Sequence, residues 1–109
     1  MKIIQPCCEP VLVEPVGAAE ADELAAAFKL LADPIRLRIL SLIANSARGE
    51  LCACDLPGLI ERSQPTVSHH LSLLTEAGLV SREQRGKWAF FTVERDRVAV
   101  LRDALSVGG

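Results

Sequence analysis

The positions of proline and glycine constrain the fold of this chain more than any other feature of the sequence. Proline lacks a backbone N–H and clashes with the preceding turn, so a helix accepts it without strain only in its first turn. Pro34 directly follows Asp33, a residue type that caps helix N-termini, and the pair predicts a helix start. Pro65 likewise marks the first turn of a helix, and Gly78 marks its end. The chain is therefore expected to form short helices separated by sharp breaks.

Apolar residues recur along these segments at helical spacing. Within the segment that ends at Gly78, Val67, Leu71 and Leu74 form a stripe that is predicted to be buried. Further along, β-rich runs on both sides of Arg85 indicate a hairpin. The predicted elements, in chain order, are helices at 19–32, 33–45, 51–62 and 63–78, a hairpin at 79–93 and a last helix at 96–106.

The composition fits one domain with an aliphatic core. Of the 109 residues 50% are hydrophobic but only 4% are aromatic, and tyrosine is absent, which favours packed helices over a β-sandwich. The chain has no apolar run of about 18 residues and no export signal, so we expect a cytoplasmic protein with no membrane contact. In that compartment its four cysteines are expected to be metal ligands or redox thiols rather than structural disulfides.

The beginning of the chain differs from the rest. Residues 1–19 are rich in proline and lack helical periodicity, so they are predicted to form a flexible N-terminal arm that precedes a folded domain at 20–109. Two adjacent cysteines, Cys7 and Cys8, lie on this arm. A role in a packed core is not expected for them, and we interpret both as ligands for a metal or metalloid.

The order of four helices, a hairpin and a last helix predicts a mainly α fold with a small β-hairpin, the winged helix-turn-helix. The outer face of the helix at 63–78 carries short, uncharged hydrogen-bonding groups, which can approach base edges and phosphates closely. Residues 62–97 hold six Lys or Arg against four Asp or Glu, which permits DNA contact although an ordinary solvated surface would have the same balance. The residues predicted to contact DNA are Ser63, Gln64, Thr66, Ser68, His69 and Ser72 on the helix, and Arg82, Arg85 and Lys87 on the hairpin.

Four stretches of the chain resemble the ArsR-type family of metalloregulatory repressors: "ADPIRLRILSLI", "ELCACDL", "SQPTVSHHLSLLTEAGLV" and "REQRGKWAFFTV". The resemblance covers about residues 22–105. It implies a homodimeric repressor that leaves double-stranded operator DNA when a toxic metal or metalloid binds, and it implies a dimer interface built from the first and last helices. A protein of this kind is not an enzyme and requires no cofactor.

The motif "ELCACDL" matches the thiolate sensing motif of that family, so the resemblance assigns ligand roles to Cys52 and Cys54. Because Pro57 must lie in the first turn of the next helix, both cysteines are expected at the start of that helix. On a regular helix residues i and i+2 do not face each other, so this pair can share one ion only where the segment is extended or distorted. We therefore predict a site of three sulfurs, from Cys7, Cys8 and one of the pair. Such a site suits As(III), supplied as arsenite, and also antimonite, because thiolates select soft ions.

Other interpretations remain open at this point. A cadmium or lead sensor would recruit all four thiols, and a redox-sensing repressor would join an arm thiol to one of the helix pair in a disulfide. A small thiol enzyme such as an arsenate reductase is not expected, because the chain has no C-x-x-C motif and no βαβ pattern. His69 and His70 are not expected to share a metal ion, since adjacent residues on a helix point about 100° apart. The resemblance further implies that the arm of one subunit closes over the thiol pair of the other.

Overall fold

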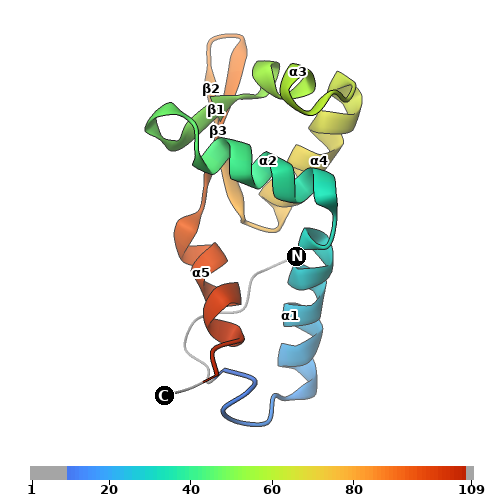
Figure 1. Cartoon of the computed structure of the whole chain (residues 1–109), viewed down its shortest axis with the longest axis vertical. Helices are drawn as coiled ribbons and strands as arrows, with labels where there is room; N and C mark the ends of the chain where they lie inside the picture. Colours follow the sequence, from blue (N-terminus) through green and yellow to red (C-terminus); the bar gives the residue numbers. More distant parts are fainter. Residues whose placement is uncertain (1–9, 108–109) are drawn as a thin grey trace.

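Five α-helices and a three-stranded antiparallel sheet form the part of the chain that this computed structural model describes, residues 10–107 (Figure 1). The mainly α fold with a β-hairpin is confirmed. The helices are α1 (Ala18–Leu31), α2 (Pro34–Ala44), α3 (Leu56–Ile60), α4 (Gln64–Glu76) and α5 (Arg95–Ala104). The strands are β1 (Glu50–Cys52), β2 (Val80–Arg85) and β3 (Trp88–Val93), and short 3₁₀ turns, Ala47–Gly49 and Ala53–Asp55, flank β1.

The predicted helix starts are confirmed in atomic detail. The carboxylate of Asp33 accepts two backbone N–H groups of the first turn of α2, at 2.9 and 3.1 Å. The hydroxyl of Ser63 accepts the backbone N–H of Thr66 in the first turn of α4. Gly78 follows α4 with a φ of +77°, a left-handed conformation that glycine adopts without steric cost. Local sequence signals therefore define where α2 and α4 begin.

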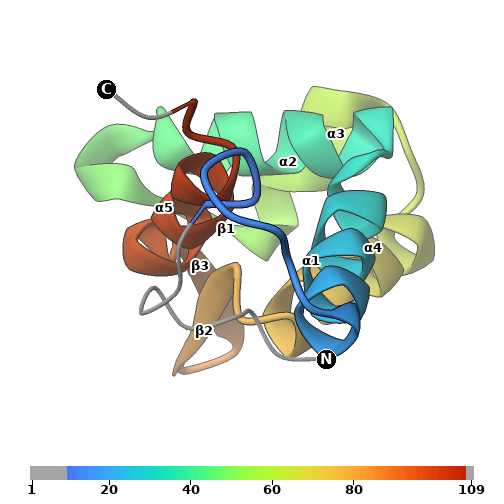
Figure 2. The same ribbon diagram turned by 90° about the horizontal axis from the view of Figure 1, so that it is seen from below.

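The core lies between α2, α3, α4 and the sheet. The predicted stripe of α4 is buried, with Val67, Leu71 and Leu74 only 1%, 3% and 0% exposed. From the other elements, the largest fully buried side chains are those of Ile39, Ile43, Leu56, Ile60, Leu79 and Val80. α1 and α5 contact each other and extend toward one end of the molecule (Figures 1 and 2). Their buried residues, Leu24, Ala27, Leu30, Val100 and Leu101, belong to the same core cluster.

The sequence predicted a helix within residues 51–62, but its first part is not α-helical. Glu50–Cys52 form β1 and Ala53–Asp55 form a 3₁₀ turn. β1 pairs with β3, so that the sheet has the order β1-β3-β2, and Leu51 lies opposite Phe91. The helix begins only at Leu56, which keeps Pro57 in its first turn. A strand of three residues is too short to show a period of two, and its pairing partner lies about 40 positions away. That is why the strand was not predicted.

The described part of the N-terminal segment contacts the last helix. The backbone N–H of Val11 donates to the carbonyl of Ala104 at 3.0 Å, and the Val11 side chain packs against the core cluster. α1 begins at Ala18, slightly before the predicted boundary of the folded domain. Cys7 and Cys8 lie outside the described residues. Within the described range, no helix combines the length and the apolar character that crossing a membrane would require.

Candidate nucleic-acid interface and thiol pair

The outer face of α4 is exposed and polar. Gln64, Ser68, His69 and Ser72 all lie on the surface, opposite the buried stripe. The other two predicted contact residues, Ser63 and Thr66, take part in capping α4. The hydroxyl of Ser63 donates to that of Thr66 at 3.0 Å, in addition to accepting its backbone N–H. The structure therefore brings all six predicted helix residues to one end and one face of α4.

The β2–β3 hairpin stands beside this face as a wing. Its turn consists of Gly86 and Lys87, since Arg85 and Trp88 are the last paired residues. The ammonium of Lys87 lies 5.1 Å from the centre of the Trp88 ring, and Trp88 is 47% exposed. Trp88 was not among the predicted contact residues. The available signal was an aromatic residue directly after a Gly-Lys turn, in a chain with one tryptophan.

A groove of about 540 Å³ separates α4 from the wing. Ser68 and Ser72 line one side of it, Arg82 and Lys87 the other. Cys54 also lines this groove. The polar helix face, the basic wing residues and one thiol thus border a single concave surface.

Arg85 is exposed like Arg82 and Lys87, but its guanidinium already has carboxylate partners within the protein. Its guanidinium donates to both carboxylate oxygens of Glu50 at 2.8 and 2.7 Å, pairs with Glu83, and lies over the ring of Phe90. The hydrogen bonds that Arg85 donates to Glu50 and then to Glu83 raise the pKa of Arg85 further above its ordinary value. In this arrangement the Arg85 guanidinium is paired with carboxylates of the protein itself, and the pair with Glu50 connects the wing to β1. Its predicted contact with DNA stays a prediction.

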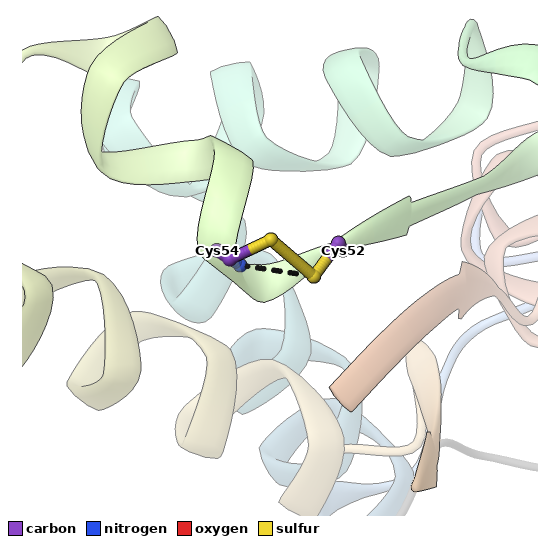
Figure 3. Close-up of a disulfide and its surroundings, with 2 residues drawn as sticks. All are labelled: Cys52 and Cys54. Atoms are coloured by element: carbon purple, nitrogen blue, oxygen red, sulfur yellow. Dashed lines mark hydrogen bonds between the residues drawn. A yellow bond between two sulfur atoms is a disulfide. The ribbon is translucent and has the colours of Figure 1, made fainter. Parts of the chain in front are cut away.

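The two cysteines of the motif lie side by side, but ahead of α3 rather than at its start. Cys52 ends β1 and is 6% exposed, whereas Cys54 lies in the following 3₁₀ turn and is exposed. Their Cα atoms are 5.2 Å apart, and a disulfide joins the two sulfurs (Figure 3). The backbone N–H of Cys54 also donates to the sulfur of Cys52. This is the extended case in which residues i and i+2 can act together.

Two of the four predicted ligands are thus close together. Within residues 10–107, no group of three or more His, Cys, Asp or Glu side chains is arranged to hold a metal ion. Once the disulfide is reduced, the pair offers two soft sulfur donors, which fit a thiophilic ion but do not complete a three- or four-sulfur site. The remaining predicted ligands, Cys7 and Cys8, lie outside the described residues.

On the inner face of α4, a buried histidine contacts an arginine of α2. His70 is 9% exposed, and its Nδ1 lies 3.0 Å from Nη1 of Arg36. Desolvation by burial is the main cause that lowers the pKa of His70 below its ordinary value. From the sequence, His70 was weighed only as a metal ligand. Its contact with Arg36 is not predictable there, because nothing local connects two residues 34 positions apart.

A helix-turn-helix with an exposed polar second helix and a flanking basic hairpin defines the winged helix-turn-helix class of DNA-binding proteins. Residues 33–82 match the family described as "Bacterial regulatory protein, arsR family". The chain belongs to this family, and it is a DNA-binding transcriptional regulator rather than an enzyme.

Relatives and a solved structure support the assignment. An uncharacterized HTH-type transcriptional regulator of Methanocaldococcus jannaschii is 40% identical over 71% of this chain and 84% of its own length. The arsenical resistance operon repressor of Escherichia coli is 48% identical over 59% of this chain. A cadmium resistance regulatory protein CadC homolog of Staphylococcus aureus is 37% identical over 72% of this chain. The match spans only 53% and 64% of those two relatives. The crystal structure of the AntR antimony-specific transcriptional repressor superimposes with a TM-score of 0.68 and 27% identity, over 82% of this chain and 79% of that one.

Proposed function

We propose that this protein is a cytoplasmic, homodimeric repressor that binds operator DNA through α4 and the wing, and releases it when its cysteines bind trivalent arsenic. The observation that carries the proposal is the shared groove. Cys54 borders the same concave surface as the polar face of α4 and the basic wing residues. A ligand held there lies next to the elements that read DNA.

The thiol pair supports a thiophilic ligand. When reduced, Cys52 and Cys54 present two sulfurs from one extended segment, with Cys54 open to solvent. Trivalent arsenic takes three sulfurs in a pyramid, so one further thiol from the N-terminal segment would complete its site. Arsenite exchanges each hydroxyl for one thiolate sulfur and releases water, a substitution that requires no oxidant or reductant. Antimonite has the same donor preference.

The contact between Val11 and Ala104 supports an arm that serves the partner subunit. It lies at the end of the molecule opposite to β1 and α3 (Figure 1). Cys8 is only two residues before Pro10, a distance of at most about 7 Å along an extended chain. While this contact holds, the arm thiols have little reach toward the pair of their own subunit. A site between subunits, as the family resemblance implies, leaves the contact intact.

Exposed apolar side chains support the homodimer. Leu12 and Val13 of the N-terminal segment and Leu105 after α5 are 60%, 49% and 51% exposed in the single chain. Leu12 and Val13 precede α1 and Leu105 directly follows α5, the two helices that extend toward one end of the molecule (Figure 1). A second copy of the chain would cover them, and would set two α4 helices at a fixed spacing of roughly 34–36 Å for two half-sites.

A redox-sensing repressor is a second candidate, favoured by the disulfide between Cys52 and Cys54. It differs from the redox alternative in the sequence analysis, which joined an arm thiol to one of the pair. A peroxide would take two electrons and two protons from the two thiols and leave as two molecules of water or alcohol. A cadmium or lead sensor with four thiolates is supported by the relative named for cadmium resistance.

The experiment mixes two disabled forms of the protein into a heterodimer. One form lacks the arm thiols (Cys7→Ser, Cys8→Ser), and the other lacks the pair (Cys52→Ser, Cys54→Ser). A site between subunits leaves one complete site in each heterodimer, because the intact arm meets the intact pair. Native mass spectrometry with arsenite under reducing conditions should then count one arsenic, against two in the wild-type dimer.

Each disabled homodimer is the control and should bind no arsenic at the same concentration. A heterodimer that also binds none contradicts the site between subunits. Alkylation separates the ligands, because arsenite should protect three thiols per site whereas cadmium should protect four. If peroxide releases DNA and arsenite does not, the redox candidate replaces the arsenic one.

A further inference from the structure

The guanidinium of Arg36 joins three helices at one point. Its Nε donates to the carbonyl of Leu30 in the last turn of α1 at 2.7 Å. Its Nη2 lies 3.7 Å from the carboxylate of Asp33, which caps α2. Its Nη1 faces Nδ1 of His70 on the inner face of α4 at 3.0 Å. Arg36 is itself mostly buried, with 15% of its side chain exposed.

This contact is a directional restraint on α4. Among residues 10–107, it is the side-chain hydrogen bond that joins α4 to another element, since those of Ser63 and Thr75 stay within the helix and its cap. The apolar contacts of the buried stripe resist separation but do not strongly resist rotation or sliding. A hydrogen bond depends steeply on angle and therefore fixes rotation about the helix axis.

The contact also fixes the protonation state of the histidine. Arginine only donates hydrogen bonds, so Nδ1 of His70 must accept and the ring proton must lie on Nε2. The ring is therefore neutral when the contact is made. Three charged or titratable groups act on it: Asp33 and Arg36 from α2, and His69 from its own helix. Asp33 favours the charged ring, whereas Arg36 and His69 oppose it.

We propose that Arg36 and His70 position the DNA-reading helix, and that protonation of His70 releases it. The inference rests on the proposed reading of DNA by α4. His70 directly follows His69 and is two residues from Ser68 and Ser72, so a change in its rotation moves the whole outer face. Protonation removes the acceptor at Nδ1 and puts a second cation against the guanidinium. Arg36 and His70 are thus positioning residues that touch no DNA.

The expected pH dependence has a definite sign. Burial lowers the pKa of His70 from its ordinary value of 6.5, so the folded, paired state binds the proton less readily. The restraint is fully present above that ordinary value and is lost as the pH falls below it toward the lowered pKa. DNA affinity should therefore decrease in mild acid. His69 acts in the opposite direction, because a proton on the exposed outer face adds a cation next to phosphates.

The test measures operator affinity from pH 7.5 to 5.5 in a His69→Asn background, which removes the opposing contribution. The probe is a fluorescent duplex that carries a palindrome selected in vitro with the His69→Asn protein, because His69 is itself a predicted DNA contact. Binding is followed by anisotropy at constant ionic strength. With His70 present, affinity should fall several-fold across this range, because the protonated ring cannot accept the hydrogen bond of Arg36. With His70→Asn the profile should be flat, because the amide oxygen accepts the bond of Arg36 but does not titrate.

His70→Leu is the matched variant that packs but cannot accept. It should lower the ratio of operator affinity to random-duplex affinity at every pH, while circular dichroism shows that the helices persist. An unchanged ratio with His70→Leu, or the same pH slope with Asn as with His, overturns the inference. The tautomer of His70 can also be measured directly from its imidazole ¹⁵N chemical shifts. If these shifts place the ring proton on Nδ1 at pH 7.5, the pairing with Arg36 is overturned, whether or not the protein binds DNA. Absence of any selective DNA binding by the wild-type protein would instead refute the proposed function.

Discussion

The wing carries two basic residues that are open to solvent and one that is already paired, and this difference predicts their contributions to DNA binding. Within residues 10–107, neither Arg82 nor Lys87 forms an ion pair with a carboxylate. Arg85 forms ion pairs with both Glu50 and Glu83. A phosphate contact by Arg85 would require it to exchange these partners. We therefore expect Lys87→Ala to weaken binding to all sequences, and Arg85→Ala to have a much smaller effect on the electrostatic part of binding.

The magnitude follows from counterion release. The slope of log affinity against log salt is about −0.9 for each phosphate that the protein neutralises on duplex DNA. A homodimer has two wings, so Lys87→Ala should reduce the slope by about 1.8, provided each lysine contacts one phosphate. Arg85→Ala should change it by less than about 0.5. Glu50→Gln should make the slope steeper, because it leaves Arg85 with one carboxylate partner instead of two.

The assay is a titration of a labelled operator duplex by anisotropy at several salt concentrations between about 50 and 200 mM, a range in which phosphate contacts dominate. Arg102→Gln is the matched control. Arg102 also forms an ion pair, with Asp103, but on α5, at the far end of the molecule from the wing (Figure 1). The reasoning is refuted if Arg85→Ala and Lys87→Ala reduce the slope equally, or if Glu50→Gln leaves it unchanged.

Other predictions concern stability. Leu74→Ala, at a fully buried position of α4, should lower the free energy of unfolding by about 2–5 kcal/mol in urea. Leu59→Ala, at a 49% exposed position of α3, should change it by no more than about 0.5 kcal/mol. The hydrogen bond that the backbone N–H of Arg36 donates to Asp33 is the main cause that lowers the pKa of this carboxyl group. The Asp33 carboxylate should therefore stabilise the fold fully above its ordinary pKa. This contribution should be lost as the pH falls and the carboxylate is protonated. Asp33→Asn should keep the cap and reduce the loss of thermal stability in acid, and equal acid sensitivity of both proteins would contradict this.

The sequence predicted those parts of the fold that depend on neighbouring residues. A cap and a proline lie within three positions of each other, so the starts of α2 and α4 could be read from Asp33 and Ser63. The buried stripe of α4 follows from helical spacing alone. The polar outer face was found by the same periodicity. Such local signals do not depend on how distant segments meet.

Contacts between distant residues were not predicted. Glu50 is 35 positions from Arg85, and both residues are of a type that is usually solvated. The sequence therefore assigned Arg85 to DNA without showing its partner. β1 was missed for the same reason, because it exists through its pairing with β3. A strand in place of a helix start altered the expected geometry of Cys52 and Cys54, and brought their sulfurs together.

The two elements that we propose to read DNA are held by different anchors, and we propose that this difference lets the thiols control binding. α4 is tied through Arg36 to the ends of α1 and α2, whereas the wing is tied through Glu50 and the β1–β3 ladder to the strand that ends at Cys52. On this proposal, an ion bound to the thiols displaces the second anchor and leaves the first in place. Because a winged helix needs its helix and its wing in fixed relation to fit one half-site, a small displacement of β1 is enough to weaken binding within each subunit. This local route adds to any change in the spacing of the two α4 helices. A variant without the arm thiols separates the two routes at an arsenite concentration well above the one that saturates the wild type. An ion held there by the pair alone can still displace the wing but cannot cross-link the subunits.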